Sequence, residues 1–262
     1  LANSSCRYFA LDLANSITGT ARYVIQEAIR YVESKGYEVI YSDTDSMYIV
    51  AEKDPEKVGK ELEKEVNDYF TDLVKKKFKR DSVLELEFEK VYTKFIMPKL
   101  RGSTKGAKKR YAGLVDGKLE VVGMEAVRGD WTILAREFQK ELLVKVFNGE
   151  KLEAWVKKFV KDMKSGKFDD KLVYRKSIRK PLEEYVKMTP PHVKAARNCK
   201  NFTGSLVEYV LTTEGPECIC CKKHELDYAH YLEKQIKPIA ETILELLGKD
   251  FEKMLDGQTT LF

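Results

Sequence analysis

Two aspartates separated by one residue form the part of the sequence best suited to chemistry. Asp43 and Asp45 lie in the polar run Tyr41-Ser42-Asp43-Thr44-Asp45-Ser46, between two short runs rich in β-branched and aromatic residues. Such flanks around a compact polar centre predict a β-hairpin with both aspartates at its tip. If the backbone there is extended, the two side chains point to one side, and their mutual repulsion favours binding of a cation. Hard carboxylate oxygens suit Mg²⁺, which indicates metal-assisted phosphoryl or nucleotidyl transfer.

The composition describes a globular chain with much exposed charge. Its 262 residues are 43% hydrophobic and 34% charged, enough to bury one large core or two modest ones. The net charge of +5 permits an anionic partner without requiring one. No apolar run approaches the roughly 20 residues of a membrane span, and the N-terminus lacks the layout of a signal peptide. These features predict no membrane partner and a reducing, cytoplasmic location.

Five cysteines are present, an odd number, and three of them stand close together at Cys218, Cys220 and Cys221. This crowding does not suit a disulfide framework. A metal site that includes the nearby His224 and His230 is conceivable, but the spacing matches no standard zinc knuckle. The sequence therefore favours a loop of reduced thiols over zinc at the three cysteines.

Ordinary turn chemistry is the alternative for Asp-Thr-Asp, because aspartate, threonine and serine are all common in turns. The whole run Tyr41–Ser46 is more specific: it resembles motif C of the family B DNA polymerases, a Tyr-x-Asp-Thr-Asp-Ser hairpin of the palm domain. The resemblance implies two Mg²⁺ ions, with Asp45 as the firmer ligand and Asp43 in a supporting or second-metal role. It also implies a nucleotide-binding role for Thr44.

The first residues resemble the end of the family's motif B, Lys-x-x-x-Asn-Ser-x-Tyr-Gly. Asn3 and Ser4 match, which implies a nucleotide contact by Asn3, whereas Cys6 and Arg7 occupy the tyrosine and glycine positions. The lysine of this motif, the motif A aspartate, most of the fingers and the exonuclease region would all precede Leu1. We therefore expect either a fragment of a longer polymerase or a subunit whose metal cage is completed by an N-terminal partner polypeptide.

Helices are expected on both sides of the hairpin. Apolar residues recur at helical spacing over about Leu13–Lys35, and a second helix with a charged outer face follows Pro55. The alternating segment Val83–Glu89 predicts a strand with one acidic face, which on an exposed edge would only protect against aggregation. It resembles a palm strand of the same family that places a glutamate near the metals. This implies Glu87 as a metal ligand, and Glu89 as the second choice.

A segment rich in lysine and arginine, Lys90–Arg110, contains no acidic residue and could follow a phosphate backbone. For most of its scattered lysines, solvation is the simpler interpretation. The string at its end resembles the family's Lys-Lys-Arg-Tyr motif, which grips primer-template DNA. That resemblance implies DNA contacts by Lys108, Lys109, Arg110 and Tyr111.

The next motif, Gly-x-Glu-x-Val-Arg-Gly-Asp-Trp, resembles the segment of the family where palm passes into thumb. It implies a further DNA contact by Arg128, while Gly129 replaces a second arginine and removes one charge. Asp130 is expected to cap the helix that follows.

The second half of the chain predicts mostly helices. One helix is expected over about Leu152–Met163, a strand over Leu206–Thr212 and a long final helix over about Asp227–Leu247. Between the first two, a pair of prolines at 190 and 191 favours a new helix start. The Pro-His-Val segment there resembles the thumb of archaeal family B enzymes, where it and its basic neighbours face duplex DNA. This implies DNA contacts by His192, Lys194 and Arg197.

Together these matches predict an α+β fold, a palm with an antiparallel sheet and packed helices followed by a mostly helical thumb. The predicted domains are a palm at 1–125 with the end of the fingers at 1–12, a thumb at 126–256 and a tail at 257–262. In the tail, Gln258, Leu261 and Phe262 resemble the start of a sliding-clamp-binding motif. The implied function is extension of a primer on a DNA template from dNTPs, in association with the nucleoid.

Two other functions stay open. A catalytically silent DNA-binding accessory subunit of a replication complex would agree with the departures at Cys6, Arg7 and Gly129, but not with intact Asp43 and Asp45. A different two-metal enzyme, such as a nuclease, would leave the thumb-like second half unexplained.

Overall fold

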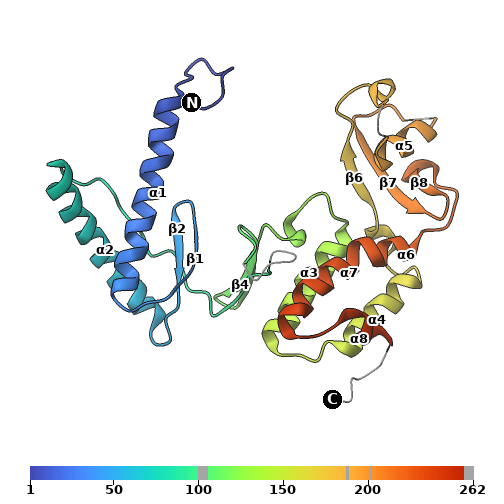
Figure 1. Cartoon of the computed structure of the whole chain (residues 1–262). Coiled ribbons are helices and arrows are strands. Elements are labelled where there is room, and N and C mark those ends of the chain that lie inside the picture. Colours follow the sequence, from blue (N-terminus) through green and yellow to red (C-terminus); the bar gives the residue numbers. More distant parts are fainter. Residues whose placement is uncertain (100–105, 187–188, 201, 257–262) are drawn as a thin grey trace. The chain divides into compact units, whose positions relative to one another are not determined.

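Two compact units are present in the computed structural model, which describes residues 1–99, 106–186, 189–200 and 202–256. The first unit covers Leu1–Val91 and the second Tyr92–Phe262 (Figure 1). Each contains helices and at least one small antiparallel sheet, so the predicted α+β class is confirmed. The predicted boundary between palm and thumb at 125/126 falls inside the second unit and stays a prediction.

The first unit consists of two long helices and a hairpin, as the sequence predicts. Its elements are α1 (Leu11–Ser34), β1 (Val39–Asp43), β2 (Ser46–Ile49) and α2 (Pro55–Phe78). Proline opens α2, where its missing N–H leaves no intrahelical bond unmade. The two helices pack against each other through buried residues at helical spacing, namely Ala28, Val32, Leu62, Val66 and Phe70.

The predicted strand at Val83–Glu89 is wrong, because this segment lies along α2 instead of pairing with another strand. Asn67 of α2 takes the place of a partner strand: its side chain accepts from the backbone N–H of Leu86 and donates to the Leu86 carbonyl, both at 2.8 Å. Glu63 accepts from the N–H of Phe88 at 2.9 Å. These side-chain bonds satisfy the backbone groups that a sheet would otherwise pair.

The second unit contains two three-stranded antiparallel sheets and a group of helices. The first sheet orders its strands as β3 (Lys94–Ile96), β4 (Tyr111–Val115) and β5 (Lys118–Val122). The turn from β4 to β5 has positive φ at both Asp116 (50°) and Gly117 (73°), which suits a tight hairpin. A 3₁₀ turn, η1 (Glu125–Val127), follows β5.

The remaining elements alternate helices with the strands of the second sheet. They are α3 (Ile133–Asn148), α4 (Glu153–Lys164), β6 (Tyr174–Ser177), α5 (Pro191–Asn198), β7 (Leu206–Thr212), β8 (Gly215–Cys218) and the 3₁₀ turn η4 (Ile219–Cys221). The chain then becomes helical from α6 (Tyr228–Tyr231) through a π-helical turn (Leu232–Ile236), α7 (Lys237–Leu244) and a 3₁₀ turn (Glu245–Leu247), before α8 (Phe251–Asp256). The helix predicted near Leu152–Met163 and the strand at Leu206–Thr212 are confirmed.

The long final helix is present but is not regular. Pro238 lacks the N–H that an α-helix would use and crowds the carbonyl four residues earlier. The π-helical turn Leu232–Ile236 ends two residues before this proline and contains the carbonyl of Lys234 that the proline would crowd, so a wider turn at this point accommodates it.

Thr132, not the predicted Asp130, caps α3. Its Oγ1 accepts from the N–H of Ala135 at 3.2 Å and is fully buried beside Gln235, whose Oε1 accepts from the N–H and the hydroxyl of Thr132. Asp130 instead pairs with Arg128 at 2.7 Å.

Among the described residues, no helix is both long enough and apolar enough to cross a membrane.

Candidate functional site

The tip of the β1–β2 hairpin holds the two candidate catalytic carboxylates. Asp43 ends β1 and pairs with Ser46, which leaves Thr44 and Asp45 as a two-residue turn. Thr44 has a φ of 57°, so the backbone between the aspartates is not extended and strand alternation does not set their directions. A tight turn sets them instead, with the N–H of Asp45 donating to the Asp43 carbonyl at 2.7 Å. The predicted hairpin is confirmed, with Asp43 half-buried and Asp45 exposed.

Short-range bonds hold the shape of this turn. Thr44 donates from Oγ1 to the Asp43 carboxylate at 3.1 Å, and Ser46 donates from its hydroxyl to the Asp43 carbonyl at 3.2 Å. Below the tip, the rings of Tyr41 and Tyr48 face each other across the strands with centroids 5.4 Å apart. The strands are anchored because their apolar side chains pack on the α1–α2 core, namely Val39, Met47 and Ile49.

The donor set at the hairpin fits Mg²⁺, which proteins often hold through only one or two carboxylates while substrate phosphates and waters complete the shell. Glu87, the predicted third ligand, is exposed on the irregular segment beside α2. Within the described ranges, Asp43, Asp45 and Glu87 do not form a group of three close enough to share one ion. A ligand role for Glu87 stays a prediction, and Glu89 is paired with Lys90 at 3.1 Å.

In the Lys-Lys-Arg-Tyr string, the two lysines are exposed and the arginine and tyrosine are half-buried. Lys108 and Lys109 are exposed at a sharp turn, where Lys109 has a φ of 58°. Gly123 permits this turn, since a Cβ there would lie 1.8 Å from the Lys109 carbonyl oxygen. Tyr111 begins β4 and packs on Phe95 with ring centroids 5.4 Å apart.

Arg110, by contrast, turns towards the protein. Its guanidinium forms an ion pair with Glu125, which is 8% exposed. The other carboxylate oxygen of Glu125 accepts from the Gln139 amide at 2.8 Å, and Gln139 in turn accepts from the N–H of Ala126. Sequence reasoning missed this network, which joins Arg110 to the η1 turn and to α3.

Arg128 and one basic residue of α5, Arg197, also bind acceptors within the protein. The bidentate pair with Asp130 raises the pKa of Arg128 and lowers that of Asp130. In α5, Lys194 is exposed, while Arg197 donates to the carbonyl of Tyr185 at 3.2 Å and holds the preceding loop. Burial, with a smaller contribution from Lys176, lowers the pKa of His192 and favours its neutral form.

Comparison with known proteins assigns the chain to a family. A family model described as DNA polymerase family B matches residues 1–247. The chain belongs to DNA polymerase family B. DNA polymerase II of Escherichia coli (strain K12) is 38% identical over 100% of this chain and 36% of its own length. DNA polymerase 2 of Aeropyrum pernix is 32% identical over 97% of this chain and 31% of its own length.

A solved structure has a fold similar to that of this chain. The family B DNA polymerase from the hyperthermophilic archaeon Pyrobaculum calidifontis matches with a TM-score of 0.64 and 27% identity, covering 95% of this chain and 32% of that one. The family B chain therefore spans about one third of the length of these relatives, which come from a bacterium and from archaea alike. The family predicted from motifs C and B and the Lys-Lys-Arg-Tyr string is confirmed.

Two further sets of predicted site residues lie at the ends of the family B chain. Asn3 is exposed, and its side-chain oxygen accepts from the N–H of Ser5 at 3.0 Å, so its nucleotide contact stays a prediction. The predicted clamp-binding residues Gln258, Leu261 and Phe262 lie outside the described residues.

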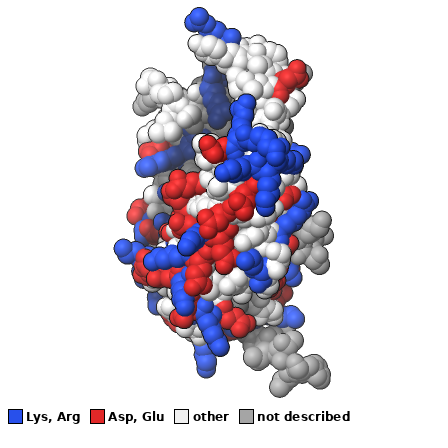
Figure 2. Space-filling view, turned by 90° about the vertical axis from the view of Figure 1, so that its left-hand side faces the viewer, with Lys and Arg blue, Asp and Glu red and all other residues white. Residues whose placement is uncertain are grey.

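Charge on this family B chain is mixed. Figure 2 shows a face on which acidic and basic side chains lie among one another. α2 contributes both signs, for example in the pair Lys57–Glu61 at 3.9 Å, which agrees with a solvated outer face. The net charge alone therefore does not identify a surface for a nucleic acid.

Sequence reasoning also missed Cys199 as a member of the cysteine group. Cys199, Cys218, Cys220 and Cys221 lie together, and burial raises the pKa of the Cys218 and Cys221 thiols. No spacing pattern connects Cys199 with the other three, so only the fold could reveal the association.

Proposed function

We propose that this chain supplies the motif C hairpin and the thumb of a DNA-directed DNA polymerase, which extends a primer on a DNA template. The observation that carries the proposal is the Asp-Thr-Asp turn at the tip of the β1–β2 hairpin in a chain of family B. Asp43 and Asp45 would hold Mg²⁺ there, with further ligands from an N-terminal part. When bound, Mg²⁺ supplies charge stabilisation to the transferring phosphoryl group and helps to activate the primer 3′ hydroxyl.

The chain's own residues have distinct parts in this proposal. The tight turn keeps the two carboxylates at one end of a hairpin anchored in the α1–α2 core, and Thr44 orients Asp43 through its hydroxyl. Asp45 is exposed, so a substrate phosphate can approach it. Asn3 and Thr44 are the candidate nucleotide contacts, and the tail residues Gln258, Leu261 and Phe262 are the candidate contacts to a sliding clamp.

DNA binding is assigned to the exposed cations first. Lys108, Lys109 and Lys194 are exposed to solvent, whereas the guanidinium groups of Arg110, Arg128 and Arg197 already bind protein acceptors. The neutral form of His192 favours packing or hydrogen bonding to DNA over charge neutralisation.

Primer extension with and without an N-terminal part tests the function. We expect no extension by the chain alone, because the hairpin supplies two carboxylates while the reaction needs a cage for two ions. Adding a polypeptide that carries motif A, the fingers and the exonuclease region is expected to give Mg²⁺-dependent extension. Extension by the chain alone would contradict the need for a partner.

A silent DNA-binding subunit is the second candidate, favoured by Gly129 in place of an arginine. It predicts binding of primer-template without extension even after the N-terminal part is added. The same assay therefore separates the two functions, provided that complex formation is verified by size-exclusion chromatography.

Replacing Lys108 and Lys109 with alanine is expected to weaken primer-template binding for all sequences alike. Phosphate contacts release counterions, so the slope of log K against log salt should fall by about one for each lysine lost. Fluorescence anisotropy between low and moderate salt measures this slope. The matched control replaces Lys157 and Lys164, two exposed lysines of α4, and should leave the slope unchanged. Equal slopes for both double variants would assign Lys108 and Lys109 to solvent.

A further inference from the structure

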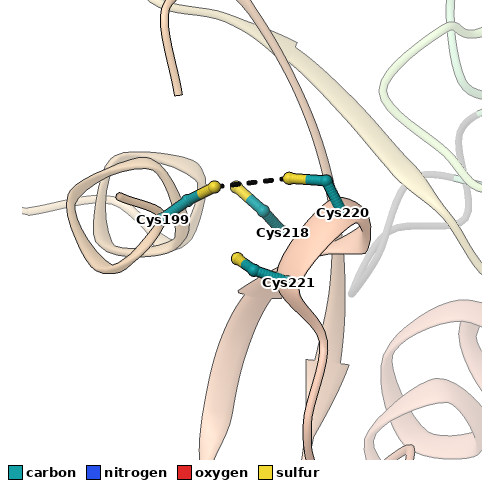
Figure 3. Close-up of side chains that lie close together, drawn as sticks. All are labelled: Cys199, Cys218, Cys220 and Cys221. Carbon is teal, nitrogen blue, oxygen red and sulfur yellow. Dashed lines mark hydrogen bonds between the residues drawn. The ribbon is translucent and has the colours of Figure 1, made fainter. Parts of the chain in front are cut away.

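Four cysteines of the second unit converge on one point. Cys199 follows the last residue of α5, Cys218 ends β8, and Cys220 and Cys221 belong to the 3₁₀ turn η4. Their four sulfur atoms all lie within 4.8 Å of one another, and the side chains point to a common centre (Figure 3). Among the described residues, no other group of three or more histidine, cysteine, aspartate or glutamate side chains is gathered closely enough to hold a metal ion.

The local backbone explains how so close a spacing arises. Cys218 is the N-cap of the 3₁₀ turn in which Cys220 and Cys221 lie, so one short turn holds three of the four cysteines. α5 packs against β8, which brings Cys199 to the same place, and the Cys218 thiol donates to the carbonyl of Ala195 in α5 at 3.3 Å. Cys199 and Cys220 approach to 3.3 Å between sulfurs.

The dimensions suit one tetrahedral ion. With Zn–S bonds of about 2.3 Å, a tetrahedral site separates its sulfurs by about 3.8 Å, so four sulfurs that all lie within 4.8 Å need only small shifts to bind. Iron–sulfur clusters place inorganic sulfide and several irons between their thiolates, which calls for a wider set. Four soft thiolates with no open position are typical of a structural zinc site.

The nearby histidines are already engaged. His224 pairs through Nδ1 with Glu217, and the Nε2 of His230 lies 3.1 Å from the Tyr174 hydroxyl. A metal site built from the three cysteines near position 220 would need His224 or His230 as its fourth ligand. The fold supplies Cys199 instead.

We propose that Cys199, Cys218, Cys220 and Cys221 bind one Zn²⁺ that fastens the end of α5 to the turn after β8. The site is closed, because all four positions are filled by this chain, so its role is structural rather than catalytic. Two of the ligands are buried and Cys220 is exposed, which leaves a side from which the ion can enter. The four cysteines belong to the second unit, whereas Asp43 and Asp45 belong to the first, and the inference does not depend on polymerase activity.

Metal analysis of the full chain tests the proposal. After purification under reducing conditions without chelator, we expect about one Zn²⁺ per chain by inductively coupled plasma mass spectrometry. Cys199→Ser and Cys221→Ser should each lose most of the zinc. Cys6→Ser is the matched control, because Cys6 lies in the first unit and should leave the zinc content unchanged.

A second measurement on the unaltered chain covers the case in which the variants fail to fold. Apo-protein refilled with Co²⁺ should show the visible absorption of tetrahedral cobalt together with thiolate-to-cobalt charge transfer, both removed by added Zn²⁺. Thermal unfolding should occur at a lower temperature after chelation, since the metal binds only the folded chain. Four results would each overturn the proposal. They are a chain with neither zinc nor a cobalt spectrum, iron bound instead of zinc, disulfides between these cysteines, and full zinc content in Cys199→Ser.

Discussion

Replacing Asp45 with asparagine is expected to abolish primer extension by the complex of this chain with its N-terminal part. The substitution keeps the size and turn preference of the side chain but removes the negative charge that would hold Mg²⁺. Removing one group that stabilises transition-state charge commonly costs 10²–10³-fold in rate, and we expect a loss of about 10³-fold or more here. Single-turnover extension at saturating dNTP measures it, while DNA binding should change little.

Asp43→Asn should be severe but should leave more activity than Asp45→Asn. Asp43 is half-buried, and its backbone carbonyl, which the substitution leaves in place, accepts the bonds that shape the turn. Asp116→Asn provides the matched control, since Asp116 occupies an exposed hairpin turn in the second unit with a φ of 50°. It should extend primers normally. If Asp43→Asn and Asp45→Asn do so as well, the motif C hairpin is only a turn.

The elements that the sequence predicted correctly are those whose signals are local. A polar run between β-branched residues was enough to predict the β1–β2 hairpin, and helical spacing with Pro55 at one end predicted α2.

The errors involve partners distant in sequence. Alternation in Val83–Glu89 predicted a strand, but Asn67 of α2 supplied the hydrogen bonds of a strand partner. β6 and β8 were missed because each is short and polar or rich in turn residues, and only pairing with the more apolar β7 makes them strands. The fourth cysteine, Cys199, joins its group only after α5 packs on β8.

Replacing Glu125 with alanine is expected to destabilise the second unit strongly. The change leaves the guanidinium of Arg110 and the fully buried amide of Gln139 without their shared acceptor. Breaking a buried ion pair costs about 3–5 kcal/mol, and we expect about 3 kcal/mol because the Arg110 side chain is partly exposed. Urea unfolding followed by circular dichroism measures this. Glu208→Ala removes one partner of the exposed Arg175–Glu208 pair and should cost no more than about 1 kcal/mol.

The same network separates the functions of adjacent residues in the Lys-Lys-Arg-Tyr string. Arg110→Ala leaves the Glu125 carboxylate, only 8% exposed, without its cation, so it should lower the free energy of unfolding while changing the salt dependence of DNA binding little. The Lys108 and Lys109 double variant should do the reverse, because both lysines are exposed. Stability and salt slope therefore distinguish support of the fold from contact with phosphate. A lowered salt slope with unchanged stability in Arg110→Ala would place its guanidinium on DNA instead of on Glu125.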